Sequence, residues 1–384
     1  MATTEEQKEI PENTENPENQ ENPENPLLIG TKPDTTKMEY RTLGNTGLKV
    51  SLLSFGNSVN NRDDKLTLDC IKLALSHGIN YFDTAEIYGL GVGETNLANA
   101  LHELNIPREK IVISTKIFKN GPDPNDCFLS RKHIIEGIYE SLERLNLEYI
   151  DIVYAHRFDI NTPLEETCRA MSWLIKKGLC FYWGTSDWTP SQIMEAIKIC
   201  NKLKLEKPVV DQCHYNMFTR INVENKYVDL IKNYKYGLAC FSPLESGILT
   251  GKYINEIPKD ARAHITYDNA NSAMDRYIKE KKSWDEKMLK LKDLAEKKLK
   301  CSLAQLCIAW VLANTDVSTC ILGAAKISQL EENLKALEIY KNIDNETWIE
   351  IENILKNVPK GENDFRNREI LPSRRNIVLG IDYK

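Results

Sequence analysis

The sequence predicts an α/β protein built on a closed (β/α)8 barrel of the TIM type, with an N-terminal β-hairpin and a disordered N-terminal tail. Short apolar segments rich in β-branched residues alternate with amphipathic helical segments. Near-continuous apolar strands separated by helices are typical of parallel strands covered by helices. Eight such units occupy roughly 280 residues, which fits a closed barrel better than a doubly wound sheet.

The N-terminal region divides into a tail and a hairpin. The segment Pro11–Pro26 repeats Pro-Glu-Asn with small variations and contains no aromatic or aliphatic residue. Because such a segment has no apolar surface to bury, residues 1–37 are predicted to be disordered. Structure is expected to begin near Met38, where two extended stretches flank the turn Gly-Asn-Thr-Gly at 44–47, a pattern that predicts a β-hairpin.

The barrel is expected to span residues 38–360. Its predicted strands are Val50–Gly56, Tyr81–Ala85, Ile111–Lys116, Ile150–His156, Cys180–Ser186, Pro208–Tyr215, Gly237–Pro243 and Thr319–Ala324. The predicted helices include Lys65–His77, Arg131–Leu145, Glu165–Lys177, Pro190–Leu203, Val223–Tyr234 and a charged helix at Trp284–Lys298.

Two further segments complete this organisation. The seventh crossover, Leu249–Ala313, is long, and long loops at the mouth of such barrels usually carry function. Residues 361–384 form a polar C-terminal extension, and the sequence leaves open whether it packs on the barrel.

Composition excludes several classes of protein. The chain has 384 residues and a net charge of -6, which gives no general attraction to nucleic acid. No apolar run approaches the roughly 20 residues that a membrane helix needs. The ten cysteines form no Cys-x-x-Cys pair and no zinc spacing, so they are expected to be reduced thiols of a cytoplasmic protein without a metal site.

Four predicted strands carry a polar or ionisable side chain at or near their carboxyl end, namely Asp83, Lys116, His156 and Ser186. The carboxyl ends of barrel strands converge on one mouth, so these residues are expected to meet there. Tyr88 follows Asp83 by five residues and is expected in the same place. Any one of them alone is more often structural than catalytic, but the combination favours an active site.

Asp83, Tyr88, Lys116 and His156 are therefore the candidate catalytic residues, and they support protonation of a carbonyl oxygen during hydride delivery. Tyrosine is a poor acid at its ordinary pKa of about 10, but an adjacent ammonium group lowers that value. Lys116 is expected to supply this charge and Asp83 to hold the lysine. His156 would donate a hydrogen bond to the substrate oxygen, and no metal is needed.

Specific motifs extend from about Glu39 to about Lys356: FDTAEIYG, STKIF, LSRKHIIEG, SLERLNLEYID, NTPLEET, YWGTSDW, FSPLESGILTGKY and LGAAKISQLEENL. Through these motifs the chain resembles the aldo-keto reductase superfamily, and within it the β subunits of voltage-gated potassium channels. The resemblance implies that Asp83, Tyr88, Lys116 and His156 form a catalytic tetrad.

The resemblance also implies NADPH or NADP+ as cofactor, bound extended across the mouth without a Gly-x-Gly-x-x-Gly loop. The nicotinamide amide would be held by Ser186 and Gln212, with Asn216 nearby. The pyrophosphate path would follow Phe241, Ser242, Pro243, Leu244, Ser246 and Gly247, assisted by Lys252 and Arg262. The adenosine end would be surrounded by Gly323, Gln329, Glu332 and Asn333. Lys326 and a helix N-terminus near Ile327 are placed to meet a 2′-phosphate, which favours NADP over NAD.

The sequence departs from the channel subunits at several of these positions. His156 stands where the channel subunits typically have asparagine. Catalytically efficient reductases have histidine at this position, and this favours an enzyme. Asp187 replaces an arginine, and the first-strand exit FGNSVNNRDD lacks the usual tryptophan. Glu245 replaces a small residue and would repel a pyrophosphate unless Arg262 or Lys252 neutralises it.

Two functions follow from these observations. The first is an NADPH-dependent reductase of a small aldehyde or ketone. The alternative is a regulatory subunit like those of potassium channels, which binds NADPH, senses its redox state with little turnover and acts on a membrane channel. The resemblance implies a homotetramer, although many aldo-keto reductases are monomers. A barrel with a purely structural role is disfavoured by the intact tetrad.

Overall fold

The structure of this protein is a computed structural model. It describes residues 38–59, 63–119, 121–259, 261–264, 272–360, 363–364, 369–370 and 374–380. The chain divides into two units, Met1–Lys32 and Pro33–Lys384, and only the second contains described residues. The predicted disordered tail, residues 1–37, lies outside them.

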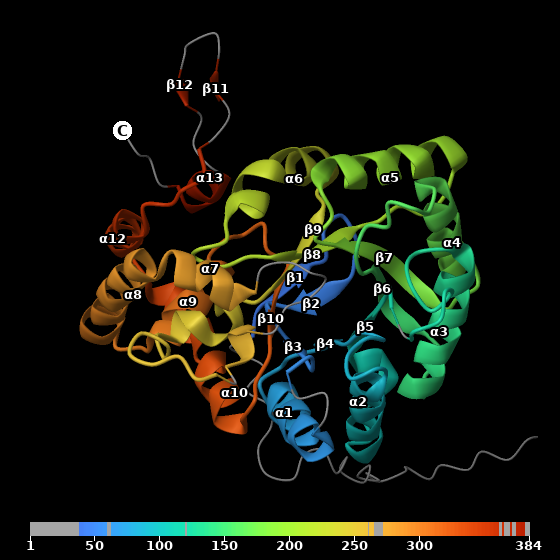
Figure 1. Ribbon diagram of the computed structural model, residues 1–384, viewed down its shortest axis with the longest axis horizontal. Helices are drawn as coiled ribbons and strands as arrows, with labels where there is room; N and C mark the ends of the chain where they lie inside the picture. Colours follow the sequence, from blue (N-terminus) through green and yellow to red (C-terminus); the bar gives the residue numbers. More distant parts are fainter. Residues whose placement is uncertain are drawn as a thin grey trace, which may run out of the picture. The chain divides into compact units, whose positions relative to one another are not determined.

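The second unit is a closed barrel of eight parallel strands, which confirms the predicted fold (Figure 1). Each strand pairs with the next one along the chain, and β10 pairs with β3 to close the barrel. The strands are β3 (Leu53–Gly56), β4 (Tyr81–Asp83), β5 (Val112–Ile117), β6 (Ile150–Ala155), β7 (Cys180–Ser186), β8 (Val210–His214), β9 (Gly237–Phe241) and β10 (Thr319–Leu322).

The predicted hairpin is present, but the segment predicted as one strand, Val50–Gly56, forms parts of two. β1 (Tyr40–Thr42) pairs antiparallel with β2 (Lys49–Ser51), and the barrel strand β3 begins at Leu53. Leu52 separates β2 from β3: its N–H donates to Glu39 and its carbonyl accepts from Cys320 of the barrel. A continuous apolar run therefore hid a change of hydrogen-bonding partner.

The apolar core has two layers. The smaller one fills the barrel and includes Tyr81, Tyr154 and Val210, together with Val50 of the hairpin. The hydroxyl groups of Tyr81 and Tyr154 lie 2.9 Å apart, so each buried phenol has a hydrogen-bonding partner. The larger layer lies between the strands and the surrounding helices.

Helices cover the strands on the outside (Figure 1). The first six are α1 (Asp64–Ser76), α2 (Val92–Glu103), α3 (Arg131–Leu145), α4 (Leu164–Lys176), α5 (Pro190–Leu203) and α6 (Val228–Tyr234). The prediction of a single helix over Val223–Tyr234 was wrong, because a π-helical turn at Asn222–Lys226 precedes α6. The alternation of strands and helices also calls for a helix between β4 and β5, and α2 lies there.

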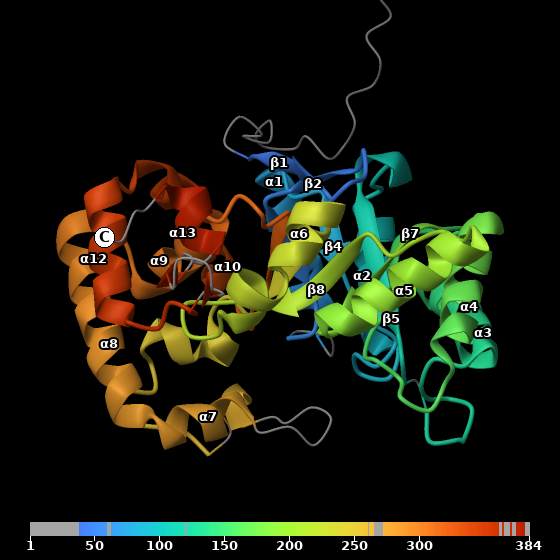
Figure 2. The same ribbon diagram turned by 90° about the horizontal axis from the view of Figure 1, so that it is seen from above.

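The seventh crossover carries α7 (Ala273–Lys279), α8 (Lys281–Leu294) and α9 (Leu303–Leu312). After β10 follow α10 (Ile327–Leu334), α11 (Ala336–Ile339), α12 (Asn345–Leu355) and α13 (Arg374–Leu379), with a short hairpin β11 (Asn363–Asp364) and β12 (Glu369–Ile370) before α13. Figures 1 and 2 both place α13 beside α12. None of the helices formed by the described residues is long and apolar enough to cross a membrane.

One buried carboxyl group on β8 makes stability depend on pH. Asp211 is fully buried and accepts hydrogen bonds from Thr185 Oγ1 at 2.6 Å and from the Tyr227 hydroxyl at 3.2 Å. Burial and the charge of Asp187 raise the pKa of Asp211 from 3.8 to about 7. The folded state holds this proton more tightly than the unfolded state, so stability falls as the pH rises from about 4 to about 7.

Asp211→Asn is expected to remove that loss, because the amide never becomes charged and keeps one oxygen that can accept a hydrogen bond. In thermal denaturation, the melting temperature of the variant should rise relative to that of the wild type as the pH increases from about 4 to 7. Above about pH 7 the difference between the two melting temperatures should stay constant. Asp229→Asn, at an exposed position of α6, is the control. Parallel curves for Asp211→Asn and wild type would contradict the assignment.

Candidate active site

The centre of the candidate site is a buried ion pair between neighbouring strands. Asp83 ends β4, and Lys116 lies near the end of β5. Lys116 Nζ lies 2.6 Å from Asp83 Oδ2 and also donates to the carbonyl of Thr84 at 2.6 Å. Both side chains are nearly inaccessible to solvent, at 0% and 3% exposed. The charges are therefore held in place at the mouth of the barrel.

Asp83 is fixed from two sides of the barrel. Its Oδ1 accepts from the Ser114 hydroxyl at 2.6 Å on the neighbouring strand. It also accepts from Gln212 Nε2 at 2.9 Å, which reaches across the mouth from β8.

Burial lowers the pKa of Lys116, but Asp83 and Tyr88 raise it more, and the net pKa lies above its ordinary value. Lys116 is thus a permanent cation.

Tyr88 stands on the loop after β4, with its hydroxyl 3.2 Å from Lys116 Nζ. The loop is tied to its surroundings by main-chain bonds: Tyr88 N–H donates to Ala85, and Gly93 N–H donates to Tyr88. The Asn57 amide donates in turn to the Gly93 carbonyl at 2.6 Å, which links the loop to the end of β3. The half-buried Tyr88 side chain is therefore held against the lysine.

The effect of Lys116 on Tyr88 is smaller than expected from the sequence. Burial raises the pKa of Tyr88, Lys116 lowers it and Asp83 raises it, so that the net pKa lies above its ordinary value. Lys116 opposes the effect of burial without reversing it. The phenol accordingly stays protonated, as a proton donor must before it reacts.

His156, directly after β6, lies beside Tyr88 with the two rings edge to face and their centroids 6.4 Å apart. Burial, together with the positive charges of Arg157 and Lys116, holds the pKa of His156 well below its ordinary value. The imidazole is neutral at physiological pH. It can therefore donate a hydrogen bond to a substrate oxygen without carrying a charge.

The structure thus brings together the four candidate catalytic residues. Three strand ends and one loop supply a phenol, a fixed cation, its counter-ion and a neutral imidazole. A carbonyl oxygen placed between Tyr88 and His156 would meet two hydrogen-bond donors. This arrangement can polarise a carbonyl and protonate the oxygen as negative charge develops on it.

The residues expected to hold the nicotinamide amide, Ser186 and Gln212, lie beside this centre, together with Phe241, the first residue expected on the pyrophosphate path. Ser186, at the end of β7, donates its hydroxyl to the carbonyl of Gln212 at 3.0 Å. Phe241, at the end of β9, is half-buried, and its ring stacks on His214 with centroids 5.2 Å apart. Ser186, Gln212 and Phe241 therefore lie at adjacent strand ends of the same mouth.

Glu245 follows β9 and is neutralised by partners other than those expected. It is fully buried, and its carboxylate contacts Arg276 of α7, His214 Nε2 at 2.7 Å and Asn216 Nδ2 at 2.5 Å. Burial alone would raise the pKa of Glu245, but His214 and Arg276 lower it to about 2. The expected neutralisation by Lys252 is wrong: this exposed side chain lies over Tyr253. The Arg262 side chain lies outside the described residues.

The remaining residues expected on the pyrophosphate path form a tight turn. Ser242, Pro243 and Leu244 lead into the 3-10 segment Glu245–Thr250, where Ser246 and Gly247 have positive φ values of 54° and 89°. A Cβ at Gly247 would lie 2.8 Å from Lys252 Nζ. The exposed lysine can move aside, so this position favours glycine because of its positive φ.

The residues expected at the adenosine end lie after β10. Gly323 is exposed and faces the exit of β3, because a Cβ there would come within 2.6 Å of Val59 Cγ2. Lys326 is exposed and precedes α10, with no side chain capping the first turn. Gln329 accepts from the N–H of Ala325 at 2.9 Å. Further along α10, Glu332 is half-buried and Asn333 is buried.

Two arginines of the site were missed. Arg157 follows His156, and its guanidinium donates to the Ser186 hydroxyl at 3.0 Å and lies 3.6 Å from Asp187. Its place at a strand end was the signal that could have identified it. Arg276 lies on α7, and no sequence pattern connects that helix with the turn at Glu245.

Comparison with known proteins gives two further findings. The sequence model of the Aldo/keto reductase family matches residues 52–356. A relative from Arabidopsis thaliana named probable voltage-gated potassium channel subunit beta is 44% identical over 339 residues, covering 86% of this chain and 100% of the relative. A relative of the same name from Oryza sativa subsp. japonica is 43% identical with the same coverage.

Proposed function

Because this chain belongs to the aldo/keto reductase family, we propose that it is an NADPH-dependent reductase that converts a small aldehyde or ketone to an alcohol. The observation that carries the proposal is the contact of Lys116 Nζ with both Tyr88 and Asp83, beside a neutral His156. A purely structural ion pair would need no adjacent phenol at the mouth. We expect the enzyme to act in the cytoplasm.

The residues around the mouth fit a dinucleotide phosphate. The buried acid in the turn, Glu245, is already neutralised, so it does not exclude an anion. The first turn of α10 offers main-chain N–H groups without a side-chain cap, next to the exposed cationic side chain of Lys326. Ser186 and Gln212 would hold the carboxamide, and Phe241 would lie at the start of the pyrophosphate path. When bound, the reduced nicotinamide supplies the hydride.

The protein's own residues perform the proton transfer. His156 and Tyr88 orient the carbonyl by hydrogen bonding to its oxygen. As negative charge develops there, the Tyr88 hydroxyl donates its proton, and the phenolate that remains is stabilised by Lys116 at 3.2 Å. Asp83 keeps the ammonium group in place and shares no proton with the substrate, because it is buried behind the lysine.

A second candidate function is favoured by the names of the relatives. Both are called probable potassium channel β subunits and match this chain over their whole length. The chain would then bind NADPH, assemble as a tetramer and report the redox state to a membrane channel, with little turnover. His156, a good hydrogen-bond donor at the substrate oxygen, favours the enzyme.

The two functions are distinguished by measuring binding and turnover separately. Fluorescence titration should show NADPH binding more tightly than NADH. The near-ultraviolet absorbance of NADPH should then fall on addition of 4-nitrobenzaldehyde. Absence of binding would overturn both functions, whereas tight binding without oxidation across a panel of aldehydes and ketones would overturn the reductase.

Glu245→Gln is expected to increase NADPH affinity roughly three- to tenfold, because it removes a negative charge next to the pyrophosphate path. The charge of Arg276 would then act on the phosphates unopposed by this carboxylate. His214 adds no charge in this variant, because Glu245 is the main group that raises the pKa of this buried imidazole. Glu256→Gln removes an exposed carboxylate of the same crossover and should have no effect. Weaker binding by Glu245→Gln would show that the carboxylate is needed to shape the site.

A further inference from the structure

The C-terminal extension packs on the barrel through two arginines of α13. Arg374 forms a two-point ion pair with Asp316, with distances of 2.7 and 2.8 Å, near the surface. Arg375 is completely buried, and its guanidinium carbon lies 3.5 Å from the centre of the Trp310 ring. This helix begins beyond residue 356, where the family match ends.

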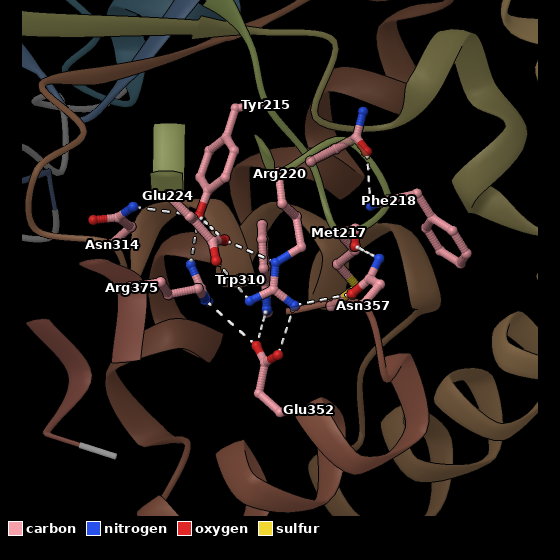
Figure 3. A network of polar contacts seen from close by, with 11 residues as sticks. Tyr215, Met217, Phe218, Arg220, Glu224, Trp310, Asn314, Glu352, Asn357 and Arg375 are labelled. Carbon is pink, nitrogen blue, oxygen red and sulfur yellow. Dashed lines mark hydrogen bonds and ion pairs between the residues drawn. The ribbon is translucent and has the colours of Figure 1, made fainter. Parts of the chain in front are cut away.

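Arg375 joins a buried network of two arginines and two glutamates (Figure 3). Arg220 makes a two-point contact with Glu224 and lies 2.6 Å from Glu352. Arg375 Nε lies 3.6 Å from Glu352, and its Nη1 donates to the Tyr215 hydroxyl at 3.2 Å. All four charged side chains are at most 3% exposed. Two positive and two negative charges balance, and Arg375 supplies one of them.

Tyr215 connects this network with the candidate site. Its hydroxyl donates to Glu224 at 2.8 Å and accepts from Asn314 at 3.2 Å, in addition to Arg375. Tyr215 directly follows β8, between His214 and Asn216, which both contact Glu245. Anchoring of the Tyr215 hydroxyl outside the barrel therefore restrains the main chain that carries the site residues.

We propose that Arg375 is a positioning residue: from α13 it completes the buried charge network and, through Tyr215, fixes the end of β8 for cofactor binding. The cofactor part of this inference rests on the proposed function. Within the described residues, Nε and Nη2 of Arg375 have no hydrogen-bond partner. The ring of Trp310, the charge of Glu352 and one hydrogen bond hold the guanidinium.

A second substitution in the same network can restore the charge balance that is lost with Arg375. Arg375→Met keeps much of the side-chain volume but leaves an unbalanced negative charge among buried groups, which is strongly unfavourable. Adding Glu352→Gln restores neutrality, because Arg220 keeps its pair with Glu224. Arg374→Met is the matched control, because it removes the neighbouring arginine of the same helix without touching Tyr215.

The test measures amide hydrogen exchange over residues 210–216 without cofactor, and NADPH affinity, in the full-length chain. Arg375→Met should speed exchange in this segment and weaken NADPH binding about tenfold. Arg374→Met should change neither quantity. Arg375→Met combined with Glu352→Gln should recover part of both losses, because the buried charges balance again.

Two results would overturn the proposal. Unchanged exchange at 210–216 in Arg375→Met would show that Tyr215 is held without the arginine. Faster exchange with unchanged NADPH affinity would make the contact structural only. If the wild type itself binds no NADPH, the proposed function fails, and the exchange measurement alone decides whether α13 holds β8.

Discussion

Tyr88→Phe is expected to lower turnover of an aldehyde by about a thousandfold and to leave NADPH affinity unchanged. The phenyl ring fills the same space, but the proton donor next to Lys116 at the substrate oxygen is removed. Lys116 retains Asp83 and the Thr84 carbonyl as partners, so the ion pair should persist. Stopped-flow absorbance of NADPH with 4-nitrobenzaldehyde measures the rate, and fluorescence titration measures the affinity.

The control is Tyr139→Phe, which removes an exposed hydroxyl on α3. It should leave both quantities unchanged. If Tyr88→Phe retained more than about a tenth of the wild-type rate, a role as general acid, worth at least about a hundredfold, would be excluded.

Lys116→Met is expected to abolish turnover and to destabilise the fold by about 3–5 kcal/mol, because the buried Asp83 carboxylate loses its counter-ion. The remaining partners of Asp83, Ser114 and Gln212, donate hydrogen bonds but carry no charge. Chemical denaturation measures the loss of stability, and the same absorbance assay measures turnover.

The stability effect is separated from the catalytic effect by a second substitution. Asp83→Asn combined with Lys116→Met leaves no unpaired charge, so much of the lost stability should return. Turnover should not return, because nothing then stabilises the Tyr88 phenolate. Recovery of activity in the double variant would show that the pair only supports the fold.

The strand ends of the site could be predicted from the sequence because they follow from the barrel itself. Once eight parallel strands close, Asp83, Lys116 and His156 must share one mouth. The boundaries of those strands could be predicted nearly as well, because each apolar run ends at a polar side chain. The π-helical turn at Asn222–Lys226 could not be predicted, because this segment has one apolar residue, Val223, and so no apolar spacing that would distinguish a π turn from an α turn.

Contacts that depend on long loops could not be predicted. Arg276 reaches Glu245 from a helix 31 residues later in the chain, and no periodic pattern encodes that approach. The pKa of Tyr88 was misjudged for a related reason. The sequence places a lysine nearby, but the amount of burial that opposes its charge depends on packing.

The C-terminal extension illustrates the same limit. The segment around Arg375 is polar, and its composition alone gave no sign of packing. In the structure, Glu352 supplies the opposite charge and Trp310 the aromatic face on which Arg375 packs. These two residues belong to two other helices. A buried arginine is visible only when these partners are placed in space.

The central claim, hydride transfer to a carbonyl, is tested most directly by single turnover with NADPH deuterated at the transferred position of the nicotinamide. Excess enzyme would be mixed with labelled cofactor and 4-nitrobenzaldehyde, and the product analysed by mass spectrometry. The account predicts 4-nitrobenzyl alcohol with one deuterium on its carbinol carbon, and no such product from Tyr88→Phe on the same timescale. Tight binding of NADPH with no deuterated alcohol, for this aldehyde and for a panel of others, would contradict it.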